Sequence, residues 1–243
     1  MRRLLPASLV FLCAFMALAA HATAAPLRIL VIGNSYVSRP NLCARLERLA
    51  KAMDREAKCD LVEGNDYSLE DHWDEGKAQR RIREGWDVVV LQQGPSAEER
   101  NRATFLRDAK RFDAVIRAAG AKPAVFSAWP AQIDVGDFPA AIRSARAAAD
   151  AIGAPVIPVA EAWMRVLQKD YKMRLWSDGL HATELGADLE LLTTWFTLFP
   201  AGPQDFTEAY VTKIANEMHM PARTRDALFD AATRAVDEPL PLK

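Results

Sequence analysis

The chain has 243 residues, of which 50% are hydrophobic, and its 31 basic and 32 acidic side chains leave a net charge of −1. This balance gives no reason to expect binding to nucleic acid or to an anionic membrane. The length is sufficient for one α/β domain with a full core, and three cysteines are too few for a disulfide-rich scaffold.

The first 24 residues have the pattern of a secretory signal peptide. Met1-Arg2-Arg3 is basic, the stretch from Leu4 to Ala20 is apolar, and Ala22-Thr23-Ala24 supplies the small residues of a cleavage site. Cleavage is therefore expected after Ala24. An uncleaved membrane anchor is the alternative, but the apolar run is at the short end for spanning a bilayer and the Ala-x-Ala end favours removal.

Export to the periplasm or the medium is expected, without stable membrane insertion after cleavage. The residues before Cys13 are not small, which argues against a lipoprotein signal. Residues 25–243 are expected to form a single domain with a helical tail from about residue 204, and this mature chain keeps Cys43 and Cys59.

Strand-like and helix-like patterns alternate along the mature chain. Short apolar runs predict five strands: Leu27–Ile32, Cys59–Glu63, Trp86–Leu91, Ala124–Ala128 and Val156–Val159. Apolar residues at three- and four-residue steps predict helices over residues 41–58, 78–83, 103–119 and 140–152. This alternation predicts an α/β fold, with a parallel sheet covered by helices on both faces.

The remainder of the chain is predicted to be mainly helical. One helix is expected over residues 183–199, with Thr183 as a plausible N-terminal cap, and a helical tail over residues 204–236. The Pro-rich end from Glu238 to Lys243 is expected to fray.

The first predicted strand runs into Gly33-Asn34-Ser35. Ile29 to Ile32 are apolar without interruption, as in a central strand of a parallel sheet. Ligands collect at the carboxyl ends of such strands, so the hydroxyl of Ser35 is well placed for chemistry. An ordinary loop is the alternative, because glycine, asparagine and serine are common in loops and at helix starts.

A nucleophilic serine needs a base, and the base needs a third group that orients it. Of the four histidines, His21 lies in the signal and His219 in the late tail. His181 follows Asp178 by three residues, a spacing that in a turn brings the carboxylate to Nδ1 and leaves Nε2 free to face Ser35. A surface turn without catalytic role is the alternative for this pair.

Four blocks of residues together resemble the SGNH (GDSL-like) hydrolases. They are Gly33-Asn34-Ser35 after the first strand, Gly64 after the second, Gln92-Gln93-Gly94 after the third, and Asp178-Gly-Leu-His181. More narrowly, they resemble the exported subgroup whose first block reads Gly-Asn-Ser, over residues 27 to about 199. The resemblance implies a flavodoxin-like three-layer sandwich and a serine esterase that needs no cofactor. It assigns Ser35 as nucleophile, His181 as general base and Asp178 as the partner that orients the base.

The resemblance also implies an oxyanion hole. Its donors in the family are the N–H of the serine, the N–H of a block-two glycine and a block-three asparagine side chain. Ser35 and Gly64 match the first two, whereas a simple alignment places Ser96 where the asparagine belongs. Gln92 is ranked first as its replacement, because it ends a buried strand and carries an amide donor. The other candidates are Gln93, Asn65 and Ser96.

Several further residues are candidates for substrate binding. His72 either lines the cleft or caps a loop, and the two interpretations have equal weight. Trp129 and Trp176 either stack on sugar rings or pack in the core, with the core slightly favoured. Asn34, Asn65 and Gln93 complete this set.

Neither a metal nor another cofactor is expected. The histidines lack a His-x-x-x-His spacing, and neither mature cysteine is close to a histidine in sequence. Only one glycine follows the first strand, so neither a phosphate-binding loop nor a dinucleotide fingerprint is present there.

These observations predict an exported esterase that cleaves an acetyl or other short acyl ester, with a carbohydrate ester among its candidate substrates. Acyl transfer to a sugar by the same triad is one alternative. A carbohydrate-binding or envelope accessory protein that has lost a competent oxyanion hole is the other, and the departure in block three supports it. The oligomeric state is not predicted.

Cys43 and Cys59 are predicted not to pair. In a strand–helix–strand crossover the helix runs back along the sheet, so its first residue and the start of the next strand lie at opposite edges. A helix of about 15 residues separates them by roughly 20 Å, whereas a disulfide requires Cα atoms within about 7 Å.

Overall fold

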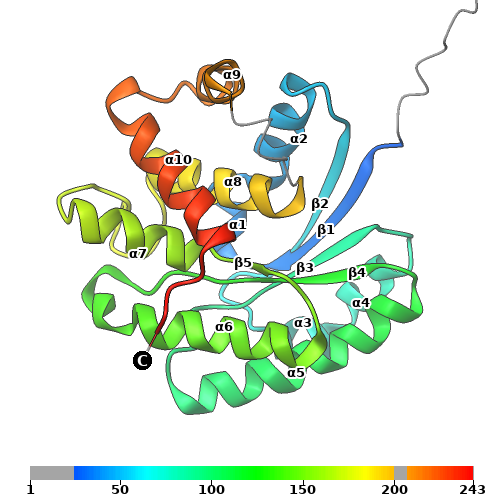
Figure 1. Cartoon of the computed structure of the whole chain (residues 1–243). Helices are drawn as coiled ribbons and strands as arrows, with labels where there is room; N and C mark the ends of the chain where they lie inside the picture. The colour runs from blue at the N-terminus through cyan, green and yellow to red at the C-terminus, as the bar shows by residue number, and fades with distance from the viewer. Residues whose placement is uncertain (1–24, 200–206, 243) are drawn as a thin grey trace, which may run out of the picture.

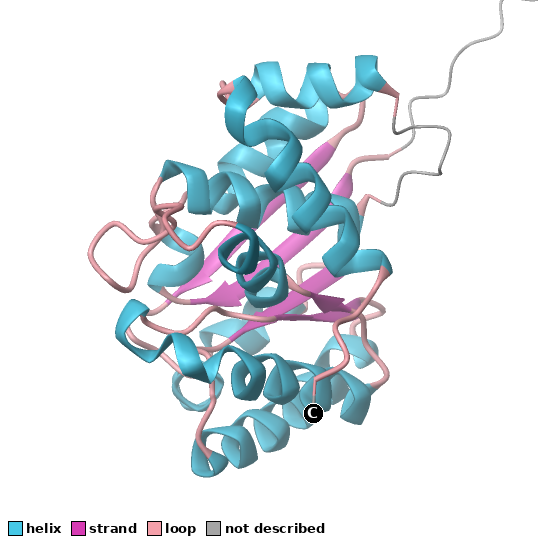
Figure 2. Cartoon of the chain, turned by 60° about the vertical axis from the view of Figure 1, so that its left-hand side comes forward, coloured by secondary structure: helices cyan, strands magenta, loops and turns pink. Residues whose placement is uncertain are grey.

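A five-stranded parallel sheet with the strand order β2-β1-β3-β4-β5 forms the centre of the molecule. The computed structural model describes residues 25–199 and 207–242, so the predicted signal peptide lies outside the described residues. The strands are β1 (Leu27–Gly33), β2 (Ala57–Glu63), β3 (Val88–Gln92), β4 (Lys122–Phe126) and β5 (Val156–Ile157). Helices cover both faces of this sheet (Figures 1 and 2), which confirms the predicted flavodoxin-like α/β fold.

β1 is buried on both of its faces, as its uninterrupted apolar sequence predicts. It pairs in parallel with β2 on one side and with β3 on the other. Successive side chains of a strand point to opposite faces, so Ile29 and Val31 join one core cluster while Leu30 and Ile32 join the other. The strand that leads into Ser35 is therefore anchored from both sides of the sheet.

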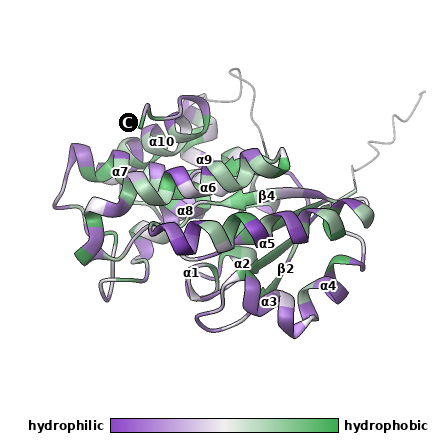
Figure 3. Cartoon of the chain, turned by 90° about the horizontal axis from the view of Figure 1, so that it is seen from below, coloured by the Kyte–Doolittle hydropathy of each residue, from purple (hydrophilic) through white to green (hydrophobic). Residues whose placement is uncertain are grey.

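The helices form two layers. One layer contains α1 (Ser35–Ser38), α2 (Leu42–Ala52), α7 (Val159–Lys169), α8 (Glu184–Leu198), α9 (Glu208–Glu217) and α10 (Ala222–Asp237). The other contains α3 (Leu69–Glu75), α4 (Lys77–Ile82), α5 (Glu99–Ala118) and α6 (Phe138–Ile152), preceded by the 3-10 segment η1 (Gln132–Asp137). Hydrophilic and hydrophobic stretches alternate along α5 in Figure 3, as expected for a helix with one buried face.

Several predicted elements differ from the structure at their ends, and two of the differences have a clear physical reason. α2 ends at Ala52, six residues before the expected end, because Asp54 adopts φ +55° in the turn that leads into β2. The segment around His72 was expected to be a loop and is the helix α3. Ser68 and Asp71 form a capping box at the start of this helix. The capping box is a local signal for a helix, but the apolar pattern that follows it is short.

Cys43 and Cys59 form a disulfide with Cα atoms 5.0 Å apart, so the prediction that they stay unpaired is wrong. That prediction equated the rise along the helix with the distance between the cysteines, which requires the helix to run straight back along the sheet. Instead the first half of α2 lies beside β2, where the N–H of Cys59 donates to Glu47 Oε1 at 2.8 Å. The crossover itself is intact, because β1 and β2 pair in parallel.

The chain from Ala25 onward is therefore expected to show no free thiol when it is denatured without reductant. Reduction is expected to lower the free energy of unfolding by about 3 kcal/mol, the effect of opening a loop of this length. Thiol titration and urea denaturation measure the two effects. A Cys43→Ser, Cys59→Ser double variant serves as control and should match the reduced protein. Two thiols per chain in the untreated protein would contradict the pairing.

The Pro-rich end of the chain is held against α7, which corrects the expectation that it frays. The buried carboxylate of Glu161 accepts a hydrogen bond from the N–H of Leu240 at 2.7 Å. Arg165 also donates to Glu161, at 3.2 Å, and Arg146 pairs with the second carboxylate oxygen. Arg146 in turn donates to the carbonyl of Leu240 at 2.8 Å. This ion network thus supplies hydrogen-bond partners for the N–H and the carbonyl of Leu240. From sequence composition alone, these backbone groups were expected to be solvated.

Truncation of Glu161 is expected to destabilise the protein strongly. Glu161→Ala leaves two arginines without their buried partner, a change that typically costs about 3–5 kcal/mol. Glu208→Ala is the matched control, because its carboxylate pairs with Arg225 at 3.0 Å on the exposed surface and such pairs contribute about 0–1 kcal/mol. Urea denaturation of the two variants compares the losses. Equal losses would show that the network around Glu161 adds little.

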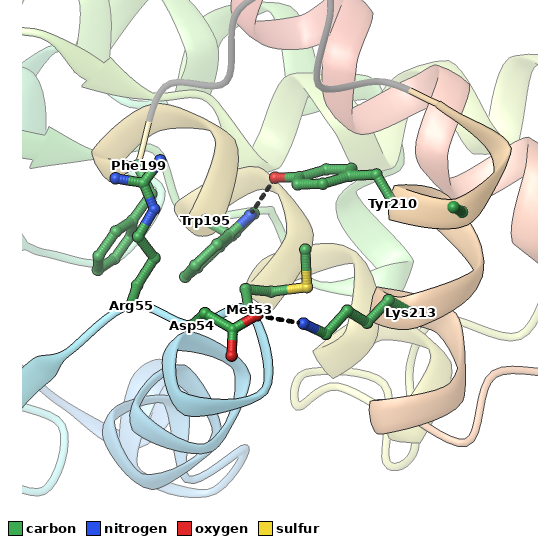
Figure 4. A pocket seen from close by; sticks show the side chains of 8 residues that line it. Met53, Asp54, Arg55, Trp195, Phe199, Tyr210 and Lys213 are labelled. Carbon is green, nitrogen blue, oxygen red and sulfur yellow. Dashed lines mark hydrogen bonds and ion pairs between the residues drawn. The ribbon is translucent and has the colours of Figure 1, made fainter. Parts of the chain in front are cut away.

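A hollow of about 340 Å³ lies between the α2–β2 turn, the end of α8 and α9 (Figure 4). Trp195 donates to the hydroxyl of Tyr210 at 2.9 Å, and Lys213 pairs with Asp54 at 2.6 Å, so these contacts attach α9 to the body. Residues 53–55 immediately precede β2, which places the hollow at the amino-terminal edge of the sheet. Ser35 follows the opposite, carboxyl edge.

Candidate active site

Ser35 lies at the point where the order of the strands reverses. The chain passes from β1 to β2 on one side and then returns to β3 on the other, and ligands of such sheets bind at the carboxyl edge beside this switch. Ser35 is the first residue of α1. Asn34 caps that helix, because its side chain accepts a hydrogen bond from the N–H of Tyr36 at 3.2 Å.

The turn from Gly33 to Ser35 is fixed by hydrogen bonds with three other segments. The N–H of Asn34 donates to Gln92 Oε1 at 2.8 Å, and its side-chain amide donates to the carbonyl of Tyr67 at 2.9 Å. His72 Nε2 lies 2.9 Å from the carbonyl of Gly33. A Cβ at position 33 would lie 2.4 Å from Gln92 Oε1, so only glycine permits this approach. The hydroxyl of Ser35 is thus presented on a rigid turn.

The loop that carries Asp178 and His181 is closed by its own backbone. Asp178 Oδ1 accepts hydrogen bonds from the N–H groups of Leu180, at 3.0 Å, and His181, at 2.8 Å. Gly179 takes φ +88° at the tip, a conformation that glycine adopts without strain. Thr183 then caps α8 by accepting from the N–H of Gly186, as predicted. Hydrogen bonds between residues close together in the chain therefore shape this loop. For this reason the Asp-x-x-His spacing by itself predicts the turn.

The structure brings the three sequence-predicted residues into one hydrogen-bonded chain. His181 Nε2 lies 3.0 Å from Ser35 Oγ, and His181 Nδ1 lies 2.7 Å from Asp178 Oδ2. When Nδ1 carries the proton and donates it to the carboxylate, Nε2 has a free lone pair that faces the hydroxyl. Ser35 and His181 are both buried. The arrangement can transfer a proton from the serine to the imidazole.

The pKa of Asp178 is held well below its usual range, first by the hydrogen bonds from the backbone and side chain of His181 and then by the N–H of Leu180. This carboxylate therefore stays ionised throughout the pH range in which a histidine titrates. Activity is expected to fall on the acid side as one group, His181, gains a proton. The pH profile of kcat/KM measures this. Constant activity between about pH 5 and 9 would exclude histidine as the base.

A cleft of about 570 Å³ opens in front of Ser35. Its walls come from residues 66–70 after β2, residues 93–104 after β3 and the η1 segment. The charged side chains that line it are Asp66, Glu70, Glu98, Asp134, Asp137 and Arg100. Carboxylates thus outnumber the single guanidinium, and this charge favours a neutral or cationic group over an anionic one.

The candidate oxyanion donors differ in whether they already donate a hydrogen bond within the protein. The N–H of Ser35, at the first position of α1, has no intrahelical acceptor. The N–H of Gly64 donates to the carbonyl of Gly33 at 3.2 Å. Gln92 is fully buried, and its Nε2 has no hydrogen-bond partner among the described residues. Asn65 is exposed beside Gly64.

Gln93 and Ser96 line the cleft, unlike Gln92. The Gln93 amide donates to Ser96 Oγ at 2.9 Å and its oxygen accepts from the N–H of Leu69 at 3.1 Å. Ser96 takes φ +52°, and its hydroxyl donates to the carbonyl of Gly94 at 3.0 Å. Gln93 and Ser96 therefore form a polar part of the cleft wall that is held in place by their own hydrogen bonds.

His72, Trp129 and Trp176 support the site from behind. His72 has no exposed surface, and burial lowers its pKa, so the neutral ring can donate from Nε2 to Gly33 beneath the serine turn. Trp129 is equally buried and donates to the carbonyl of Leu180 at 2.9 Å. Trp176 donates to the carbonyl of Pro130 at 3.1 Å. These side chains hold the Ser35 turn and the segments beside the Asp178–His181 loop, and none of them lines the cleft.

Two residues at the site were not singled out from the sequence. Tyr36 lines the cleft, with its ring 4.9 Å from that of Trp129, and burial raises its pKa above the usual range for a phenol. Arg39 contacts both Asp178 and His181. Tyr36 adjoins the serine in sequence, which is a usable signal, whereas no local pattern marks Arg39.

No family model matches the sequence, and no curated protein matches it. Solved structures do match. A DUF4886 family protein from Bacteroides uniformis has a TM-score of 0.68 at 16% identity, covering 88% of this chain and 96% of its own. A candidate SGNH hydrolase from Slackia heliotrinireducens has a TM-score of 0.57 at 23% identity, covering 71% and 99%.

The chain shares the fold of these two proteins, the second of which is described as an SGNH hydrolase. An acetylxylan esterase from Geobacillus stearothermophilus, Axe2, shares it with a TM-score of 0.54 at 12% identity, covering 69% of this chain and 92% of its own. Identities this low show a common fold only. The chemistry must therefore be argued from the residues of this site.

Proposed function

We propose that this chain is an exported serine esterase of the SGNH subgroup with a Gly-Asn-Ser first block. The observation that carries the proposal is the continuous hydrogen-bonded chain from Ser35 through His181 to Asp178, at distances of 3.0 and 2.7 Å. It lies at the carboxyl edge of the sheet beside a cleft that reaches Ser35. This is the constellation that activates a serine for attack on an ester.

The reaction follows from these positions. His181 Nε2 takes the proton as Ser35 Oγ attacks the ester carbonyl, and Asp178 stabilises the imidazolium that forms. The imidazolium then protonates the leaving alcohol, which leaves an acyl group on Ser35. Water repeats the sequence with the same base and releases the acid. The N–H of Ser35 is available to stabilise the developing oxyanion.

A short acyl group on a carbohydrate is the substrate class that the cleft supports best. Its lining is predominantly polar and carboxylate-rich, and it offers few apolar side chains to a long acyl chain. Sugar hydroxyls suit such a surface because they form many hydrogen bonds without a net charge. An acetylxylan esterase among the structural neighbours agrees with this class without deciding it.

The test uses p-nitrophenyl esters of increasing acyl length together with acetylated neutral oligosaccharides. We expect a burst of p-nitrophenol from the acetyl ester, a decline in kcat/KM as the chain lengthens, and release of acetate from the oligosaccharide. Labelling by a fluorophosphonate should map to Ser35. Turnover that survives in Ser35→Ala, or the absence of both burst and labelling, would overturn the proposal.

One observation favours a second candidate, a carbohydrate-binding accessory protein. The N–H of Gly64, the implied block-two donor, is already donated to Gly33. Calorimetric binding of oligosaccharide without any burst would select that candidate. Transfer of the acyl group to an added sugar, detected by mass spectrometry, would instead identify an acyltransferase with the same triad.

One observation agrees with export. The Cys43–Cys59 disulfide is of the kind that persists in oxidising compartments. Within residues 25–199 and 207–242, no helix has the length and apolar character needed to cross a membrane. N-terminal sequencing of the secreted protein should begin at Ala25, and retention of the first 24 residues would contradict cleavage.

A further inference from the structure

Arg39 places a guanidinium against the Asp178–His181 pair. It follows α1 directly, four positions after Ser35 in the chain. Its Nη1 lies 3.3 Å from Asp178 Oδ2 and 3.0 Å from His181 Nδ1. We propose that Arg39 is a positioning residue that shares the carboxylate of Asp178 with the imidazole and thereby sets the pH at which the base becomes protonated. This inference rests on the proposed function.

The hydrogen-bonding capacities restrict what this contact can be. Guanidinium groups donate and never accept. Asp178 Oδ1 already accepts two backbone N–H groups, so Oδ2 is the oxygen that both Nδ1 and Arg39 face. If both donate to Oδ2, the proton stays on Nδ1 and Nε2 can accept the serine proton.

The other arrangement would be inactive. If Arg39 donated to Nδ1 instead, the imidazole proton would move to Nε2, and His181 would donate to Ser35 rather than accept from it. The carboxylate is the better partner for a guanidinium, because charge-assisted hydrogen bonds are the stronger ones. Arg39 therefore supports the active tautomer as long as Asp178 is ionised. The pKa of Asp178 is held low, so this condition is met.

Arg39 also acts through its charge. A cation beside Nδ1 opposes protonation of the ring, whereas Asp178 favours it. With both present, the imidazole keeps its free lone pair to a lower pH than it would beside Asp178 alone. The Arg39 side chain is 60% exposed, so solvent reduces this effect and added salt screens it.

Other charged groups share the hollow of about 290 Å³ behind Arg39. Arg45 is engaged with Asp188 and Glu184, and it belongs with them to the α2–α8 contact. The remaining charged residues that line the hollow are Arg48, Glu217 and His219. His219 is the one histidine among them, so the experiment includes it.

The test compares Arg39→Gln with Arg39→Lys, Arg48→Gln and His219→Gln. In Arg39→Gln the acid limb of kcat/KM is expected to move to higher pH by about 0.5–1 unit, as for one charge removed at this distance in water. The shift should shrink in concentrated salt. Arg39→Lys should keep most of the wild-type profile, while Arg48→Gln and His219→Gln should leave it unchanged. An unmoved acid limb in Arg39→Gln overturns the proposal.

A second measurement separates this proposal from the proposed function. NMR titration follows the imidazole of His181 in Ser35→Ala protein, with and without Arg39→Gln, and needs no activity. A higher titration midpoint after removal of Arg39 supports the charge effect even if no ester is hydrolysed. Equal midpoints refute it even if the wild-type protein proves to be an esterase.

Discussion

Replacement of Ser35 by alanine is expected to lower kcat for ester hydrolysis by about three orders of magnitude or more, with the fold intact. His181→Ala should cause a similar loss, because the members of a triad act as a unit. Asp178→Asn should also be severe, since an amide no longer holds the proton on Nδ1. Stopped-flow assays with the acetyl ester measure these losses.

Ser38→Ala is the matched control for this series. Ser38 lies in the same short helix, and its hydroxyl donates to Glu63 instead of contacting His181. It should keep near wild-type kcat, and circular dichroism should show the same fold for both serine variants. Wild-type turnover in Ser35→Ala would eliminate Ser35 as the nucleophile.

Loss of a side-chain donor from the oxyanion hole is expected to cost about 10²–10³ in kcat with little change in KM. Gln92→Ala is the first variant to test. Its Nε2 has no partner among the described residues, and its oxygen accepts from the N–H of Asn34, next to the nucleophile. Because this donor has no partner among the described residues, it could serve the oxyanion without first breaking another bond.

Gln93→Ala and Ser96→Ala are the comparisons, because these side chains line the cleft but already bond to one another. If only Gln93→Ala lowered kcat, the oxyanion donor would be Gln93 in the cleft wall. Gln92 would then serve only to position Asn34, through the hydrogen bond from the N–H of Asn34. Normal kcat in all three variants, and in Asn65→Ala, would mean that backbone N–H groups alone stabilise the oxyanion.

The elements that the sequence predicted well depend on residues close together in the chain. The apolar run of β1 shows a strand buried on both faces, and the alternation of strands and helices shows a parallel sheet. The turn from Asp178 to His181 closes through bonds between residues three apart or fewer. Such features follow from local backbone preferences and side-chain periodicity, which are written in neighbouring residues.

Contacts between distant segments could not be predicted in this way. Cys43 and Cys59 meet because the first half of α2 lies beside β2, and the C-terminal end is held because Glu161 lies buried on α7. His72 supports Gly33 from a helix that looked like a loop. In each case the sequence contains the groups, but their separation depends on how the elements pack.

By itself, the sequence determined the fold class and the residues that form the candidate triad, because both are encoded in local patterns: the alternating strands and helices, the turn after β1 and the Asp-x-x-His loop before α8. Only the tertiary structure decided that Gln92 lies under the serine turn while Gln93 faces the cleft, and that Arg39 joins the Asp178–His181 pair. The physical reason is that hydrogen bonds form over about 3 Å. Helix crossing angles and loop paths, set by packing of the whole core, move side chains by much more than that.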